Sequence, residues 1–253
     1  MSTIMALLTL GFKRLYERAA EWLKSGRWDS LHLDMPEDFE PFLKSYLEGD
    51  VEEETLWSDY AILTGLSPPF IEIYRRRMTP IFRRLKRRGK MSGVYCYQDL
   101  SFHIKVAKIT EKTVLLEYRH RVTGEVDVEA WRRLLNEELE ASMRGWDGSM
   151  RKIDEDARNH RINVLIYNGY VKPLKEKLKK MGHNVEVIIL KKYYIRPPLE
   201  ILKALAWRKG VENLTNEEIR HYIEEHRKYL DIVISSRDVD QAHEDWTRQF
   251  TRR

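Results

Sequence analysis

The chain contains little cysteine and little glutamine, and it has no long apolar run. Its one cysteine, Cys96, excludes a disulfide within the chain and a cluster of thiolate metal ligands. No apolar stretch approaches the roughly 20 residues that a membrane-spanning helix needs, so no membrane partner is expected. Glutamine occurs at three positions, whereas Lys, Arg and Glu are abundant, which is typical of hyperthermophiles. We therefore expect a cytoplasmic protein of a thermophilic, archaeal host.

The length and composition allow two modest globular domains. The 253 residues are 42% hydrophobic, which is enough for a core in each domain, and 34% charged. The net charge of +5 is small, so the distribution of charge along the chain says more than its sum. A mild positive excess favours partners that carry phosphate.

Residues 1–150 are predicted to form a helical region that contains a small β-sheet. Apolar spacing and capping residues predict helices over residues 1–25, 36–48, 51–64 and 68–88. Short β-rich segments follow between about residues 93 and 128, and they predict a small antiparallel sheet. A further helix is expected over residues 131–143, before a linker that comprises residues 145–148 and the polar segment 151–161.

Residues 158–253 alternate between short apolar runs and amphipathic helical patterns. The runs predict strands at residues 162–167, 185–190 and 231–235. Strands that alternate with helices form parallel sheets with helices on both faces. We therefore predict an α/β domain with a three-stranded, Rossmann-like parallel sheet. Ligands of such sheets bind at the carboxyl ends of the strands.

Arginine is concentrated on one face of the helix predicted at residues 68–88, because apolar residues from Ile71 to Leu85 occupy the opposite face. A guanidinium binds phosphate oxygens in pairs and holds a backbone without reading its sequence. The candidate nucleic-acid contacts on this face are Arg75, Arg76, Arg83, Arg84, Arg87 and Arg88. The alternative is that these arginines pair with the acidic residues of the preceding helix, which are Glu52, Glu53, Glu54 and Asp59.

Polar residues follow each strand predicted between residues 162 and 235. They are Asn168-Gly169 after the first strand, Lys191-Lys192 after the second and Ser236–Asp240 after the third. A turn at Asn168 would lead into a helix whose free N–H groups attract anions, although the dinucleotide fingerprint G-x-G-x-x-G is absent. Lys191, Lys192 and Arg237 join the candidate nucleic-acid contacts. The alternative for Ser236 and Asp238 is that they cap the last helix.

The order of these segments resembles the PIN-like ribonuclease domains of archaea and bacteria over residues 160–250. The matching phrases are Gly182-His-Asn-Val185, a helix start at Thr215 with Glu217 or Glu218, and Ser236-Arg-Asp-Val-Asp240. The resemblance implies a Mg²⁺ or Mn²⁺ ion held by the catalytic carboxylates Asp238, Asp240 and Glu217. Asn168 stands where the family has its leading aspartate and offers the metal a neutral oxygen, which implies a degenerate or weakly active nuclease.

These features lead to three functional hypotheses. The first is a nucleic-acid-binding protein, directed to RNA more than to DNA, with a metal-dependent PIN-like nuclease domain of reduced activity. The second is a non-enzymatic interaction or structural module of an archaeal or viral system, with a protein partner or a second copy of the chain. The third is a nucleotide-binding transferase that uses Asn168-Gly169 and Lys191.

Overall fold

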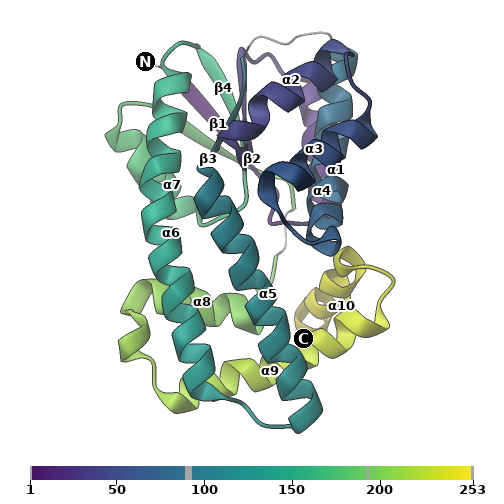
Figure 1. Ribbon diagram of the computed structural model, residues 1–253. Helices are drawn as coiled ribbons and strands as arrows, with labels where there is room; N and C mark the ends of the chain where they lie inside the picture. Colours follow the sequence, from purple (N-terminus) through teal and green to yellow (C-terminus); the bar gives the residue numbers. More distant parts are fainter. Residues whose placement is uncertain (1, 89–92, 192–193, 252–253) are drawn as a thin grey trace. The chain divides into compact units, whose positions relative to one another are not determined.

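The chain folds around a five-stranded parallel β-sheet (Figure 1). The computed structural model describes residues 2–88, 93–191 and 194–251. The sheet has the strand order β3-β2-β4-β1-β5, and its strands are β1 (Thr3–Leu8), β2 (Ser30–Pro36), β3 (Val94–Gln98), β4 (Ile162–Tyr167) and β5 (Asn184–Ile189). The predicted α/β fold is therefore confirmed, whereas the predicted count of three strands is wrong.

The central strands are apolar because both faces of the sheet are covered. Val164, Leu165 and Ile166 of β4 are fully buried in succession, as expected of a parallel strand between two helical layers. The register aligns Leu8 of β1 with Tyr167 of β4, and β4 also pairs with β2. The carboxyl ends of β1, β4 and β2 therefore reach the same edge of the sheet.

The chain divides into two compact units, and each unit combines segments that are distant in the sequence. Unit 1 contains Met1–Ile104 and Arg144–Lys191, and unit 2 contains Lys105–Met143 and Lys192–Arg253. Helices α5 (Leu100–Thr123) and α6 (Val128–Ala157) contribute residues to both units. Unit 1 holds the whole sheet.

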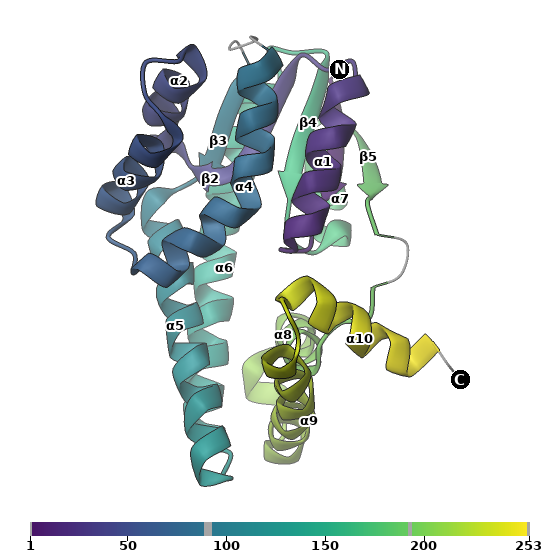
Figure 2. The same cartoon turned by 90° about the vertical axis from the view of Figure 1, so that its right-hand side faces the viewer.

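In unit 1, helices cover both faces of the sheet. Helices α1 (Lys13–Ser25) and α4 (Pro68–Arg88) lie on one face, and α7 (Val171–Lys180) lies on the other (Figure 2). The core on the α7 side joins Ile4, Ala6 and Leu165 to Ile153 of α6 and Leu174 of α7. The connection from β2 to α4 consists of the short 3-10 helix η1 (Glu37–Phe39), α2 (Glu40–Glu48) and α3 (Glu53–Thr64).

In unit 2, helices pack around a separate apolar core. Besides parts of α5 and α6, the unit contains α8 (Pro198–Lys209), the 3-10 helix η2 (Val211–Asn213), α9 (Asn216–Ser235) and α10 (Val239–Thr251). Trp131 and Leu134 of α6 meet Leu202 of α8 and Ile219 and Ile223 of α9 in this core.

Two predictions for the N-terminal region are wrong. Thr3–Leu8 is a strand rather than the start of a helix, and it lies between β4 and β5. The small antiparallel sheet expected at residues 93–128 is replaced by the parallel edge strand β3 and by α5. A short apolar run fits a buried strand or a buried helix equally well, and only the pairing partners decide between them.

The strand predicted at residues 231–235 is the last turn of α9. The Thr215 side chain accepts from the Glu218 N–H and the Glu218 carboxylate accepts from the Thr215 N–H, both at 3.0 Å, which nucleates the helix. Residues 216–235 contain no glycine or proline that would end it earlier. Ile234 is 64% exposed, unlike a residue of a central strand.

The expected domains, residues 1–150 and 158–253, would divide the strands of one sheet between them. β1 belongs to the first range and pairs with both β4 and β5 of the second range. In the described part of the chain, no helix is long and apolar enough to cross a membrane.

Candidate ligand site at the carboxyl edge of the sheet

The strand order places a topological switch point at the carboxyl ends of β1 and β4. The chain leaves β1 for β2 through α1 on one face, and it leaves the neighbouring strand β4 for β5 through α7 on the other face (Figure 2). Ligands of open α/β sheets bind where the connections of adjacent strands diverge in this way. The segments that border this point are 9–12 and 168–170.

The turn after β1 has an unusual backbone conformation. Leu10 and Gly11 have φ angles of +51° and +72°, and a left-handed conformation costs a residue with a Cβ atom about 1–2 kcal/mol. The turn is fixed by Thr9, whose N–H and hydroxyl both donate to the Tyr167 carbonyl, at 3.0 and 3.1 Å. Backbone strain of this kind is concentrated at functional sites.

Gly11 lies between two hydrogen-bond donors. A Cβ atom at this position would be 3.4 Å from Nη2 of Arg77 and 3.4 Å from Nδ2 of Asn168. Arg77 comes from α4 and Asn168 from the end of β4, so two distant segments converge on the backbone of this turn. Lys191, just beyond β5, adds a second cation, because its Nζ lies 5.5 Å from the ring centre of Phe12 at the start of α1.

Most other arginines of α4 are occupied by neighbours within unit 1. Arg83 binds Glu53 through two nitrogens at 2.7 and 3.1 Å, and Arg75 binds Glu54 at 2.8 Å. Further ion pairs at 2.7 Å join Arg76 to Glu72 and Arg84 to Glu21. The alternative of pairing with the preceding helix is thus confirmed for Arg75 and Arg83.

The remaining arginines of α4 differ in their surroundings. Arg88 donates to the Leu23 carbonyl at 3.1 Å and stacks over Trp28 at 4.2 Å. Within the described residues, neither Arg77 nor Arg87 forms a hydrogen bond or an ion pair. Arg87 is exposed, whereas Arg77 is half-buried beside Gly11.

Asp34 of β2 supplies a carboxylate to the same edge. Its side chain accepts a hydrogen bond from Gln98 at the end of β3, and the Tyr97 hydroxyl, which donates to the Ile166 carbonyl at 3.1 Å, lies beside it. Burial raises the pKa of Asp34 from 3.8 to about 6, although Tyr97, Arg77 and Gln98 each oppose the rise. The carboxylate is therefore ionised at neutral pH but carries a desolvation cost.

A series of hydrogen bonds connects the Asp34 carboxylate to buried residues of the core. Because the carboxylate only accepts, the Gln98 amide nitrogen must donate to it, which leaves the Gln98 oxygen to accept from Nδ1 of His103. Nε2 of His103 then accepts from the Tyr60 hydroxyl at 2.6 Å. Burial lowers the pKa of His103 to about 4, so the imidazole is neutral, as this arrangement requires.

Tyrosine side chains surround the two charged groups. Burial, with the Asp34 charge as the second cause, raises the pKa of Tyr16 to about 12 and raises the pKa values of Tyr74 and Tyr167 as well. These hydroxyls therefore stay protonated, and that of Tyr167 donates to the Tyr170 carbonyl at 3.3 Å. The site thus combines the cation of Arg77, an amide, a carboxylate and neutral hydroxyls.

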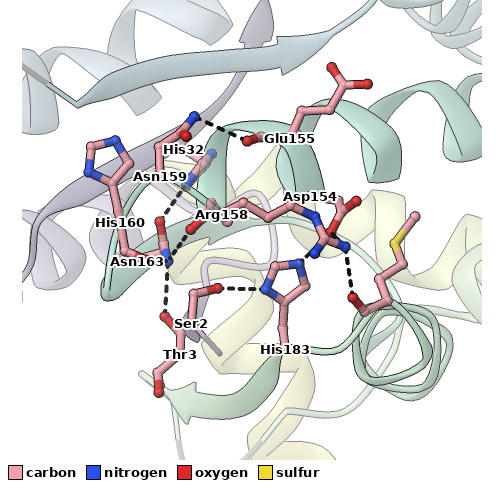
Figure 3. Close-up of polar contacts among 12 residues, drawn as sticks. Ser2, Thr3, His32, Asp154, Glu155, Arg158, Asn159, His160, Asn163 and His183 are labelled. Atoms are coloured by element: carbon pink, nitrogen blue, oxygen red, sulfur yellow. Dashed lines mark hydrogen bonds and ion pairs between the residues drawn. The ribbon is translucent and has the colours of Figure 1, made fainter.

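A second polar cluster lies at the amino edge of the sheet (Figure 3). Ser2 Oγ is 2.6 Å from Nδ1 of His183, and Nε2 of His183 is 2.7 Å from Asp154. Hydrolases with a catalytic triad have the same Ser-His-Asp sequence of hydrogen bonds. However, Ser2 and His183 are 7% and 3% exposed, and ligands of α/β sheets bind at the opposite edge.

The same cluster fixes the starts of the central strands. Asn163 of β4 accepts from Ser30 of β2 and donates to the Thr3 carbonyl of β1 at 3.3 Å. His32 lies 3.1 Å from Ser30 Oγ, and burial lowers its pKa to about 4. We therefore assign this amino-edge cluster to strand alignment rather than to catalysis.

The metal site expected from Asp238, Asp240, Glu217 and Asn168 is not assembled. Glu217 is in the first turn of α9 and Asp238 follows its end, and a helix of 20 residues is about 30 Å long. Asp238 Oδ1 accepts from the Gln241 N–H at 2.8 Å, which confirms the capping alternative for Asp238, whereas Ser236 lies at the end of α9. Asn168 belongs to unit 1. In the ranges that the structure covers, no three His, Cys, Asp or Glu side chains could hold a metal ion.

The remaining predicted contacts belong to different units. Arg237 is exposed in the turn between α9 and α10 of unit 2, while Lys191 belongs to unit 1. Lys192 lies outside the described residues. The segments 9–11 and Asp34 were missed because their strands were predicted to be helical or were not predicted. The apolar run at residues 4–8 and the alternating segment Leu31-His32-Leu33, each followed by a polar residue, were the available signal.

Comparisons of the chain with protein-family models, with curated proteins and with solved structures give no significant match.

Proposed function

We propose that this chain binds a small phosphate-bearing ligand at the carboxyl edge between β1 and β4. The observation that carries the proposal is the position of Gly11 between Nη2 of Arg77 and Nδ2 of Asn168. A side chain at Gly11 would occupy the space in front of both donors, so glycine leaves room for a ligand there. The same turn leads into α1, whose first N–H groups add positive potential.

Arg77 favours an anion for electrostatic reasons. A half-buried guanidinium has lost part of its hydration, and this loss is normally offset by a hydrogen-bonded anion. Asp34 acts on Arg77 electrostatically but forms no ion pair with it within the described residues. A bound phosphate would supply the missing acceptor oxygens, and the planar guanidinium can bind two of them.

The nucleic-acid function expected from the arginines of α4 has weaker support. Arg75, Arg76, Arg83 and Arg84 already bind glutamates, so an RNA backbone would have to displace these partners. The nuclease function has less support again, because the required carboxylates lie at opposite ends of α9. The nucleotide-binding alternative gains from the placement of Asn168 and Lys191 near the β1 turn.

Calorimetric titration with inorganic phosphate and with AMP tests the proposal. We expect Arg77→Ala to weaken binding of both probes roughly ten- to hundredfold, which corresponds to the loss of a charged hydrogen bond. Arg87→Ala is the matched control, because it removes the same charge from the same helix at an exposed position without an ion pair in the described chain. Its affinities should stay within about twofold of the wild type.

Two outcomes would contradict the proposal. One is that neither probe binds to the wild type, and the other is that the two variants bind equally well. A single-stranded RNA whose affinity falls equally in both variants would support the backbone-binding function of α4 instead.

A further inference from the structure

The position of Asp34 bears on the chemical class of the ligand, provided that the proposed phosphate site is correct. β4 lies between β1 and β2, and neighbouring strands are about 4.8 Å apart. The backbone of Asp34 is therefore two strand spacings, or roughly 10 Å, from the β1 turn. A ligand that reaches both points must extend along the sheet edge beyond its phosphate.

The Asp34 carboxylate is unsuited to a second anionic group. It is ionised at neutral pH, and the hydrogen bond from Gln98 holds it in a fixed orientation. A carboxylate has about four lone-pair positions, so further donors can be accommodated. The ligand atoms next to Asp34 must therefore be hydrogen-bond donors, and neutral hydroxyl groups satisfy this requirement.

The hydrogen bonds that connect Asp34 to the core fix the orientation of its carboxylate. Gln98, His103 and Tyr60 form one continuous series of hydrogen bonds that ends at the carboxylate. His103 is 1% exposed and Tyr60 is fully buried, so the series is held inside the core and cannot rearrange freely. Two adjacent hydroxyls on a ring would match a carboxylate that is fixed in this way.

We propose that the ligand carries a ribose 5-phosphate group, with its phosphate at Gly11, Arg77 and Asn168 and its ring hydroxyls donating to Asp34. In dinucleotide-binding sheets an acidic residue about 20 residues after the glycine turn binds the ribose hydroxyls, and Asp34 follows Gly11 at a similar separation. The difference is that β4 separates the two strands here. A free sugar phosphate and a nucleotide share this chemistry.

Titration with inorganic phosphate, ribose 5-phosphate and AMP at pH 7.5 or above tests this assignment. We expect the wild type to bind ribose 5-phosphate at least about tenfold more tightly than phosphate, because a hydroxyl bonded to a charged group contributes this much. In Asp34→Asn the preference should fall to about twofold, while phosphate binding is retained. Asp38→Asn, an equal charge change at an exposed residue of η1, should behave as the wild type.

The outcomes separate this inference from the proposed function. An equal preference for ribose 5-phosphate in the wild type and in Asp34→Asn would overturn the sugar assignment, and so would the absence of a preference in the wild type. If phosphate binding were still lost in Arg77→Ala, the phosphate site would stand. Tighter binding of AMP than of ribose 5-phosphate would identify a nucleotide, and equal binding would identify a sugar phosphate.

Discussion

Individual residues of the same type have different roles in this chain because their neighbours differ. Asp34 and Asp38 are only four positions apart. Asp38 is exposed, whereas Asp34 is partly buried among tyrosines and close to Arg77. Burial raises the pKa of Asp34 to about 6, so holding this carboxylate in its ionised form opposes folding at neutral pH.

Replacing Asp34 should therefore stabilise the fold in a pH-dependent manner. The folded-state pKa of about 6 exceeds the ordinary value of 3.8, so the folded state binds the proton more tightly and wild-type stability falls as pH rises from 4 to 6. Urea unfolding should show Asp34→Asn to be more stable than the wild type by about 1–3 kcal/mol at pH 8. The difference in stability should shrink towards pH 4. A difference that does not change with pH would show that ionised Asp34 does not destabilise the folded state.

The sequence predicts the partners of some α4 arginines but not the separate position of Arg77. The glutamates of residues 52–54 correctly suggested partners for the arginines of α4, since both segments were expected to be helical. Arg77 could not be distinguished from Arg75 and Arg76, because its separate role depends on the turn after β1. That turn becomes visible only when residues 3–8 are known to form a strand.

Among the helices and strands, those helices whose ends are marked in the sequence were predictable, whereas short apolar runs were predicted correctly at β4 and β5 and wrongly at residues 3–8 and 231–235. α3 and α4 agree with the expected helices because Gly65 ends the first and Pro68 begins the second. The runs at residues 3–8 and 231–235 have similar compositions, yet the first pairs with two strands and the second continues α9. Pairing partners that are distant in the sequence decide such cases.

Two glycines of α6 provide a matched test of helix packing. A Cβ atom at Gly145 would collide with the ring of Phe102 on α5, whereas a Cβ atom at Gly148 would meet nothing within 4 Å. Gly145→Ala should lower the free energy of unfolding by about 1–3 kcal/mol through overpacking. Gly148→Ala should raise it by roughly 0.5–1 kcal/mol, because alanine favours the helix. Urea denaturation measures both changes, and equal effects would contradict the close approach of α5 and α6 at Phe102.

At the scale of the whole molecule, the sheet is assembled from both halves of the chain. β4 and β5 follow one another in the sequence but are not neighbours in the sheet, because β1 lies between them. The sequence patterns predict both strands and their parallel direction, but they do not predict that the N-terminal strand β1 pairs with both of them. Local patterns identify a strand but do not identify a neighbour more than 150 residues away.

A fragment of residues 158–253 should therefore not fold on its own. Within the fragment β4 and β5 have lost β1, their shared partner, and their backbone groups would remain unpaired. The helices of α8 and α9 have also lost Trp131 and Leu134, which complete their core. We expect narrow amide dispersion in NMR spectra and no cooperative thermal transition, while the complete chain shows both dispersion and cooperative unfolding under the same conditions. A fragment that unfolds cooperatively would show that β4 and β5 can form a stable sheet without β1.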